Sequence, residues 1–216
     1  MTNRLQAIKA DLGKMKDNVL LVEGIDDWHT MRHIIQGTEI EIGYCGNITD
    51  ILEKLSGLTE ASNINQKIIG AILDADDQIN DRIRSLRDRL GKYYKIPNDF
   101  PSKGLISKPS NNRLPILGIW LMPNNINSGI FEDLLRQAIS SDSDDYITRV
   151  VEQAKEDNMT NFRDVEKSKA IIKTHIAWQN PNMKNVGEAI NTCFDNLSLA
   201  CKDFLNWIDE LFIHGN

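Results

Sequence analysis

The stretch "NVLLVEGIDDWHT", residues 18–30, places a carboxylate directly after a short apolar run and two more carboxylates just beyond it. A continuous apolar run of this length is typical of a strand that is buried on both faces of a parallel sheet. Gly24 ends the run, and a helix is predicted from Asp26 to Gly37, because an aspartate can cap its start and apolar residues recur at helical spacing. A buried strand needs no acid at its end, so Glu23 points to a bound ligand.

Strands and helices alternate through the rest of the first half of the chain. The sequence predicts strands at residues 40–46, 67–76, 103–108 and 115–124, and helices at residues 47–57 and 77–92. Alternation of this kind is typical of an α/β fold with a mostly parallel central sheet that is flanked by helices.

Beyond residue 124 the apolar pattern is helical only. Helices are predicted at residues 129–139, 145–156, 163–179 and 194–212. We therefore predict an α/β domain at residues 1–140 and a helical C-terminal extension at residues 141–216 that packs on it. Because the last helix carries apolar residues at helical spacing, we expect it to cover the sheet or to form an oligomer interface, as in a homodimer.

The composition is that of a globular protein, with 41% hydrophobic residues among 216. The longest apolar runs are too short to span a bilayer, and no secretory signal is recognisable, so we expect a cytoplasmic protein with no membrane contact. Three cysteines without a CxxC pair predict reduced, buried thiols. A net charge of −6 argues against a surface coated with nucleic acid but allows a local basic track.

Two of the predicted strands end in acids. Glu23 closes the first strand and is followed by Asp27, while Asp74 and Asp76 close the strand at residues 67–76. Ligands of open α/β sheets bind outside the carboxyl ends of the strands, so neighbouring strands would bring these acids to one edge. Asp74 and Asp76 share a face of an extended chain, where two carboxylates repel each other unless a cation joins them. Oxygen ligands favour Mg²⁺ or Mn²⁺ over Zn²⁺.

The same acids have a second interpretation, as helix caps or first-turn residues that the helix dipole stabilises. This interpretation fits Asp26, Asp27 and Asp77 well, because each stands where a helix is predicted to begin. It fits Glu23 and the Asp-x-Asp pair less well, because these acids belong to the ends of apolar strands.

The two acidic stretches together resemble the Toprim domain. "LLVEGIDD" (residues 20–27) carries the Glu-Gly expected after the first strand of that family, and "GAILDADDQ" (residues 70–78) carries the Asp-x-Asp expected after the third. The four-residue step from Glu23 to Asp27 is most similar to the overcoming-lysogenization-defect nucleases within the family. "GIWLMPNN" (residues 118–125) and the following Gly129 and Glu132 resemble a small Toprim-related bacterial group, although Asn124 replaces its usual acid.

This resemblance implies a Toprim-like fold and a nuclease that hydrolyses phosphodiesters of DNA or RNA. Glu23 would act as general acid or base, and Asp74 and Asp76, with Asp27, would hold Mg²⁺ or Mn²⁺. The edge that surrounds them would also include Gly24, Asn124, Asn125 and Glu132. The chain contains no P-loop, so the resemblance further implies a separate ATPase partner and a role in defence against phage.

Residues 82–95 hold six lysines and arginines against one aspartate. One interpretation is a track for the phosphates of a nucleic acid, formed by Arg82, Arg84, Arg87, Arg89 and Lys92. Lys103, Lys108 and Arg113 would extend the track, and Tyr93 and Tyr94 would stack on bases. The other interpretation is a solvated helix face whose charges pair with acids elsewhere.

Two further functions are open at this point. "LDADDQ" (residues 73–78) resembles the motif of aspartate-nucleophile phosphatases, with Asp74 as nucleophile, but Asp77 or Gln78 stands where threonine or valine is expected. The chain is also interpretable as a non-catalytic Toprim-like module whose helical third binds a partner.

Overall fold

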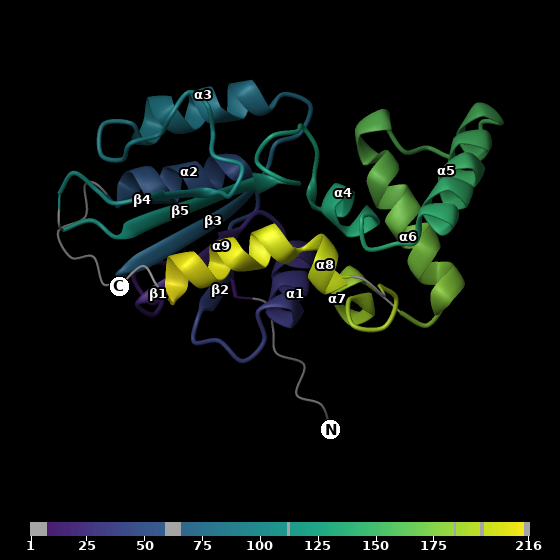
Figure 1. Ribbon diagram of the computed structural model, residues 1–216, viewed down its shortest axis with the longest axis horizontal. Helices are drawn as coiled ribbons and strands as arrows, with labels where there is room; N and C mark the ends of the chain where they lie inside the picture. The colour runs from purple at the N-terminus through teal and green to yellow at the C-terminus, as the bar shows by residue number, and fades with distance from the viewer. Residues whose placement is uncertain (1–7, 59–65, 112, 184, 195–196, 214–216) are drawn as a thin grey trace.

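The computed structural model describes residues 8–58, 66–111, 113–183, 185–194 and 197–213. Five strands form one sheet in the order β2-β1-β3-β5-β4 (Figure 1). Their bounds are Asn18–Val22 (β1), Glu41–Tyr44 (β2), Ile68–Asp74 (β3), Leu105–Ser107 (β4) and Ile116–Met122 (β5). All neighbours pair in parallel except β4, which is antiparallel to β5. The predicted α/β fold with a mostly parallel sheet is confirmed.

Helices cover both faces of this sheet (Figure 1). One face carries α2 (Ile48–Gly57) and α3 (Ile79–Leu90), and the other carries α1 (Ile25–Ile34) and α9 (Lys202–Phe212). Each face has its own hydrophobic core, with Leu86 of α3 in the first and Phe204 of α9 in the second. Residues buried on both faces explain why the strand sequences are apolar throughout.

The strand β3 shows how the two cores are divided. Ile69 and Leu73 belong to the core under α2 and α3, while Ile68 and Ile72 belong to the core under α1 and α9. Successive side chains of a strand point to opposite faces, so Asp74 shares the face of Ile72. The last residue of β3 therefore directs its carboxylate toward α1 and the C-terminal helices.

Two glycines allow α9 to lie close to the sheet. Gly70 of β3 and Gly118 of β5 are partners in the parallel register. A Cβ atom on Gly118 would lie 2.2 Å from Cδ2 of Leu211 in α9, so only glycine leaves room for this leucine. The expectation that the last helix covers the sheet is confirmed.

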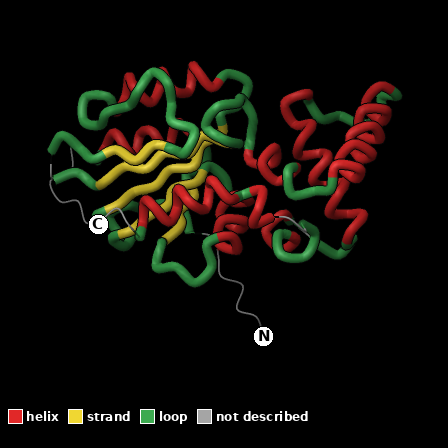
Figure 2. Tube along the Cα trace, in the orientation of Figure 1, coloured by secondary structure: helices red, strands yellow, loops and turns green. Residues whose placement is uncertain are grey.

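The remaining helices follow β5. They are α4 (Phe131–Arg136), α5 (Ser141–Glu156), a 3₁₀ turn (Asp164–Glu166), α6 (Lys167–Gln179), α7 (Val186–Ala189) and α8 (Leu197–Ala200). The helices α5 and α6 pack on each other through Ile147, Val151 and Ile171 and stand beside the sheet (Figure 2). We refer to this pair, with the 3₁₀ turn between them, as the hairpin.

The helical part differs from the sequence prediction in two places. The helix predicted at residues 194–212 is divided into α8 and α9, because the backbone at Cys201 (φ −91°, ψ 8°) departs from helical values; residues 195 and 196 lie outside the described part. The four-residue helix α7 was not predicted, since one turn is too short to show a periodic pattern.

Two expectations from composition can be compared with the fold. Cys45, Cys193 and Cys201 are buried and unpaired, as predicted. Within the described ranges, every helix is too short or too polar to cross a bilayer.

Candidate functional site

The candidate site lies at the carboxyl ends of β1 and β3, which are adjacent in the sheet. From β1 the chain passes through α1 to β2 on one side, while β3 lies on the other side. Ligands of open α/β sheets bind where the connections leave in opposite directions. Glu23 follows β1 directly and Asp74 ends β3, so both acids stand at this position.

Glu23 and Asp74 meet there, as the sequence predicted. Oε1 of Glu23 accepts a hydrogen bond from the backbone N–H of Asp74 at 2.9 Å. Oδ1 of Asp74 accepts one from the backbone N–H of Phe131, the first residue of α4, at 3.0 Å. The main chain thus fixes one oxygen of each carboxylate, and α4 is joined to the end of β3.

Asp27 is anchored in the same way at the start of α1. Its Oδ2 accepts a hydrogen bond from the backbone N–H of Gly24 at 2.8 Å, so the interpretation of Asp27 as a helix cap is correct for this oxygen. In the described residues, no donor or cation contacts the other carboxylate oxygen of Asp27, Glu23 or Asp74. Each of these three acids therefore keeps an oxygen for a ligand.

Four carboxylates at this position have a raised pKa, and we refer to them as the acidic edge: Glu23, Asp27, Asp74 and Glu132. Burial is the main cause for each. For Asp74 the negative charges of Glu23, Asp27 and Glu132 act in addition, and its pKa lies well above the ordinary value. The acidic edge is therefore a group of partly buried acids of like charge that resist ionisation.

Lys169 of α6 opposes this negative charge. It lowers the pKa of Asp27 and of Glu132, against the larger effect of burial. Burial alone would lower the pKa of Lys169, but Glu132, Asp74 and Asp27 outweigh it, and the net shift is upward. No carboxylate in the described part of the chain forms an ion pair with Lys169.

Asp76 is oriented differently from the prediction. The strand ends at Asp74, and Asp76 takes a left-handed backbone conformation (φ 51°) with its N–H bonded to the carbonyl of Gly129 at 2.9 Å. Its side chain forms an ion pair with Arg82, whose Nε also donates to the carbonyl of Asp74 at 2.9 Å. The expected extended pair of carboxylates on one face is wrong, because the chain turns between them.

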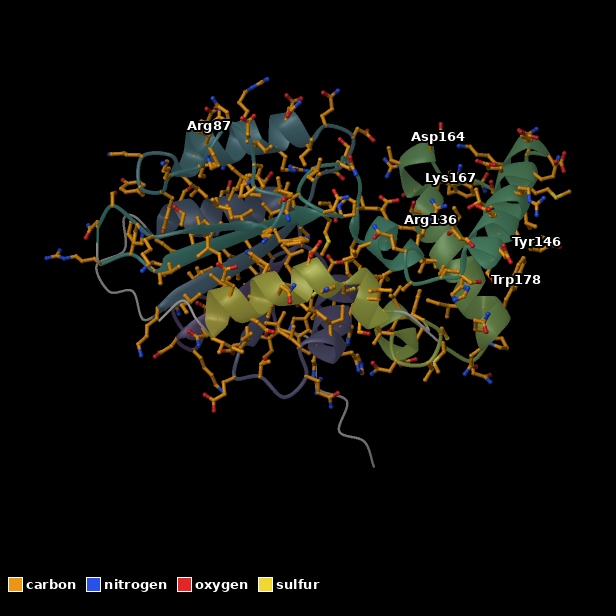
Figure 3. All side chains as sticks on the ribbon, viewed as in Figure 1. Arg87, Arg136, Tyr146, Asp164, Lys167 and Trp178 are labelled. Carbon is orange, nitrogen blue, oxygen red and sulfur yellow. The ribbon has the colours of Figure 1, made fainter. Side chains whose placement is uncertain are left out.

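A cavity of about 720 Å³ opens between this edge and the start of α6. Asp74, Asp76 and Asp77 line it on the side of the sheet, and basic residues line it on the side of the hairpin: Arg163, Lys167 and Lys169. Lys167 and Asp164, labelled in Figure 3, belong to the hairpin wall. Arg163 and Lys167 already pair with Glu166 and Glu152, so Lys169 is the wall's unpaired cation within the described residues.

The predicted asparagines of the turn after β5 have structural contacts. Oδ1 of Asn124 accepts hydrogen bonds from the N–H groups of Ile126 (3.2 Å) and Asn127 (2.9 Å), which closes the turn. Asn125 is buried, and its Oδ1 accepts from the N–H of Leu121 at 2.7 Å. Both amides are thus used by the backbone of the turn.

The predicted basic residues of α3 do not form one continuous row. Arg82 forms an ion pair with Asp76, Arg84 pairs with Asp81 at 3.2 Å, and Arg87 is partly buried with an unpartnered Nε. Arg89 and Lys92 are exposed. The row is interrupted because a helix turns its residues to different sides.

One of the two tyrosines cannot stack on a base. Tyr94 is only 4% exposed, and its hydroxyl donates to the carbonyl of Pro115 at 2.9 Å, so the prediction for Tyr94 is wrong. Tyr93 is partly exposed, and Nζ of Lys92 lies 5.3 Å from the centre of its ring.

Comparison with known proteins yields one result. Searches of curated proteins and of solved structures found no match. A family model described as "Protein of unknown function (DUF3226)" matches residues 17–213. The match begins just before β1 and ends just after α9, so it includes the sheet, the acidic edge and the hairpin. The chain belongs to the DUF3226 family.

Proposed function

We propose that the protein is a metal-dependent nuclease of the Toprim type, which hydrolyses phosphodiester bonds of DNA or RNA. One observation carries the proposal: Glu23 and Asp74 meet at the switch point of the sheet, with Asp27 close enough to raise the pKa of both. Within the described residues, each of the three acids has one oxygen held by the main chain and the other unpaired. The order of Glu-Gly after β1 and Asp-x-Asp at the end of β3 supports the Toprim-like interpretation of the fold.

The donor set fits a hard divalent cation. All candidate donors are carboxylate oxygens, which suit Mg²⁺ or Mn²⁺. Burial first, and neighbouring acids second, raise the pKa of Glu23 and Asp74, and a bound cation would offset both effects. In the described residues, no group of three or more Asp, Glu, His and Cys side chains is already arranged to hold a metal ion. Mg²⁺ commonly uses only one or two carboxylates, together with water and substrate phosphates, and Asp74 and Asp27, each with one oxygen that the main chain does not hold, would be these two.

The residues of the chain have separate tasks in this proposal. When bound, the metal would polarise a phosphoryl oxygen and lower the pKa of an attacking water. Glu23 has a raised pKa and an unpaired Oε2, which suits a group that accepts and returns a proton. Lys169, on the opposite wall of the cavity, would contact the phosphate of the substrate.

The proposal is tested by cleavage assays on plasmid DNA, single-stranded DNA and tRNA with Mg²⁺ or Mn²⁺, with and without a candidate ATPase partner. We expect cleavage by the wild type and by Asp209→Asn, an exposed acid on α9 that serves as control. Glu23→Gln and Asp74→Asn should abolish it. Cleavage that persists in both edge variants would identify a contaminating nuclease.

A non-catalytic binding module is the second candidate. It is favoured by the finding that no three acids in the described residues are already arranged to hold a metal ion. Failure of the wild type to cleave any of the three substrates, in either metal and with an ATPase present, would support the module and contradict the nuclease.

A further inference from the structure

Two sets of lysines and arginines in this protein differ in their contacts. Those of the hairpin and its neighbours have carboxylate partners: Arg136, Lys155, Arg163 and Lys167. A second group is exposed and, within the described residues, has no carboxylate at ion-pair distance: Lys92, Lys95, Lys108 and Arg113. We refer to this second group as the basic edge.

Backbone contacts bring the basic edge together. Tyr94 and Pro109 form an isolated antiparallel bridge, and the N–H of Ser110 donates to the carbonyl of Tyr93 at 2.9 Å. The N–H of Lys95 donates to Oγ of Ser107 at 3.1 Å. The loop after α3 and the loop after β4 therefore lie side by side, which places Lys95 and Lys108 on neighbouring segments of the chain.

The basic edge lies at the opposite end of the sheet from the acidic edge. Ser107, the last residue of β4, pairs with Leu117, the second residue of β5, so the loop after β4 is at the amino end of the parallel strands. In Figure 1 the loops after α3 and β4 lie at the end of the sheet away from α4. The helix α3 connects the two ends, and its twelve residues span about 18 Å.

Charge is concentrated around this surface. Residues 81–113 contain nine lysines and arginines and three aspartates, a net charge of +6 in a chain whose net charge is −6. The rest of the chain therefore carries −12. Cations that no protein carboxylate neutralises attract a polyanion, and phosphate contacts of this kind dominate binding to nucleic acids.

The surface lacks the features of a membrane contact. Surfaces that bind membranes combine basic residues with exposed apolar side chains that enter the lipid. Within the described residues of 81–113, no large hydrophobic side chain is exposed. Tyr93, which is partly exposed and lies against Lys92, is the aromatic ring that a base could contact.

We propose that the basic edge binds the sugar-phosphate backbone of a nucleic acid whose reacting phosphate lies at the acidic edge. This inference rests on the proposed nuclease function and names its substrate class: a polynucleotide that reaches along α3, and not a mononucleotide. A span of about 18 Å corresponds to roughly five nucleotides at 3.4 Å each.

Binding measured without divalent metal tests the inference separately from cleavage. The probes are fluorescein-labelled 20-mers of single-stranded DNA, duplex DNA and RNA, and a 4-mer, followed by anisotropy over a range of salt concentrations. The variant Lys92→Glu/Lys95→Glu/Lys108→Glu is compared with Lys9→Glu/Lys16→Glu/Lys202→Glu, in which three exposed lysines elsewhere are reversed. Both variants have a net charge of −12, so general repulsion is matched, and circular dichroism verifies that both are folded.

We expect the basic-edge variant to bind at least one 20-mer about tenfold or more weakly than the control variant. The affinity of the basic-edge variant should also fall less steeply with salt concentration, by the amount expected for the loss of roughly three phosphate contacts. The 4-mer should bind the control variant much more weakly than the 20-mers do, because it is too short to reach both edges. Whichever 20-mer binds most tightly identifies the substrate as DNA or RNA.

Three results would overturn the inference. They are equal binding by the two variants, equal affinity of the 4-mer and the 20-mers for the control variant, and binding to phosphatidylserine vesicles but to none of the nucleic acids. A difference between the variants without any cleavage would support the basic edge and contradict the nuclease. Cleavage that depends on Asp74, with equal binding by both variants, would support the nuclease and contradict the basic edge.

Discussion

Four carboxylates of the hairpin differ from those of the acidic edge in the charged groups that surround them. In the hairpin each of four acids has a basic partner at ion-pair distance: Asp144, Glu152, Asp164 and Glu166. Lys155 lowers the pKa of Asp164, and Arg163 lowers that of Glu166 to about 2. At the acidic edge burial and neighbouring acids raise the pKa, and main-chain N–H groups hold only one oxygen of Glu23, Asp27 and Asp74.

This difference distinguishes carboxylates whose ion pairs are part of the fold from carboxylates that have an oxygen available to a ligand. A paired acid contributes to the stability of the fold, or at least does not oppose it. A buried acid without a cation destabilises the metal-free protein, and such groups occur mainly where a ligand later supplies the missing charge. The comparison predicts that changes at the acidic edge remove activity and preserve the fold, while changes in the hairpin affect stability.

The largest expected effect concerns cleavage. We expect Asp74→Asn to reduce metal-dependent cleavage by about three orders of magnitude, since metal ions contribute several kcal/mol to stabilisation of the transition state. The variant should remain folded, because asparagine keeps an oxygen for the N–H of Phe131. Single-turnover cleavage rates and circular dichroism check the two statements. Unfolding of the variant would show that Asp74 is a structural acid.

The next effect concerns Asp144 of the hairpin and its partner Arg136, the last residue of α4. Arg136 makes two hydrogen bonds with Asp144, at 2.9 and 2.7 Å, and both side chains are less than a third exposed. Arg136→Met should lower the free energy of unfolding by about 2 kcal/mol, because it leaves Asp144 without its partner. Urea unfolding measures this change. The double variant Arg136→Met/Asp144→Leu should recover part of the loss, and failure to recover would mean that the pair is not the cause.

A smaller effect concerns stability and pH. The pKa of Asp74 is higher in the folded protein than its unfolded value near 3.8, so the folded state binds more protons and stability falls as pH rises through the folded pKa. Asp74→Asn removes this loss and should stabilise the metal-free protein by about 1 kcal/mol at neutral pH, the scale of repulsion between close charges even in water. The gain should shrink toward pH 4. Unfolding by urea between pH 4 and 8 measures it, and a gain that grows at low pH would contradict the assignment.

The smallest effect is expected at Asp164, where the ion pair with Lys155 is largely exposed on the aspartate side. Exposed pairs contribute little, because water and salt screen them. Asp164→Asn should therefore leave the midpoint of thermal unfolding unchanged within error. A marked fall would mean that the hairpin depends on its surface pairs more than the comparison assumes.

Local sequence patterns were sufficient to predict much of the sheet and part of the site. The apolar runs that became β1 and β3 end in Glu23 and Asp74, and parallel strands necessarily bring their carboxyl ends to one edge. The orientation of Asp76 could not be predicted in this way. Aspartate tolerates the left-handed conformation that it adopts here, and an Asp-x-Asp pattern does not show where a strand stops.

Features that depend on tertiary packing were missed. Lys169 faces the acidic edge only because α6 begins across the cavity from the end of β3, and no motif near residue 169 signals this. Tyr94 and the adjacent Tyr93 have the same side chain, but the bridge to Pro109 buries the first and leaves the second partly exposed. Sequence spacing does not distinguish such neighbours.

Binding of Mn²⁺ tests most directly whether the acidic edge is a site for a divalent cation. Isothermal titration calorimetry compares the wild type, Asp74→Asn and the control Asp209→Asn in metal-free buffer. We predict saturable binding to the wild type and to Asp209→Asn, and an affinity at least about tenfold lower for Asp74→Asn, which loses one of the two expected carboxylate ligands. Equal binding by Asp74→Asn and the wild type, or none by the wild type, would contradict the account.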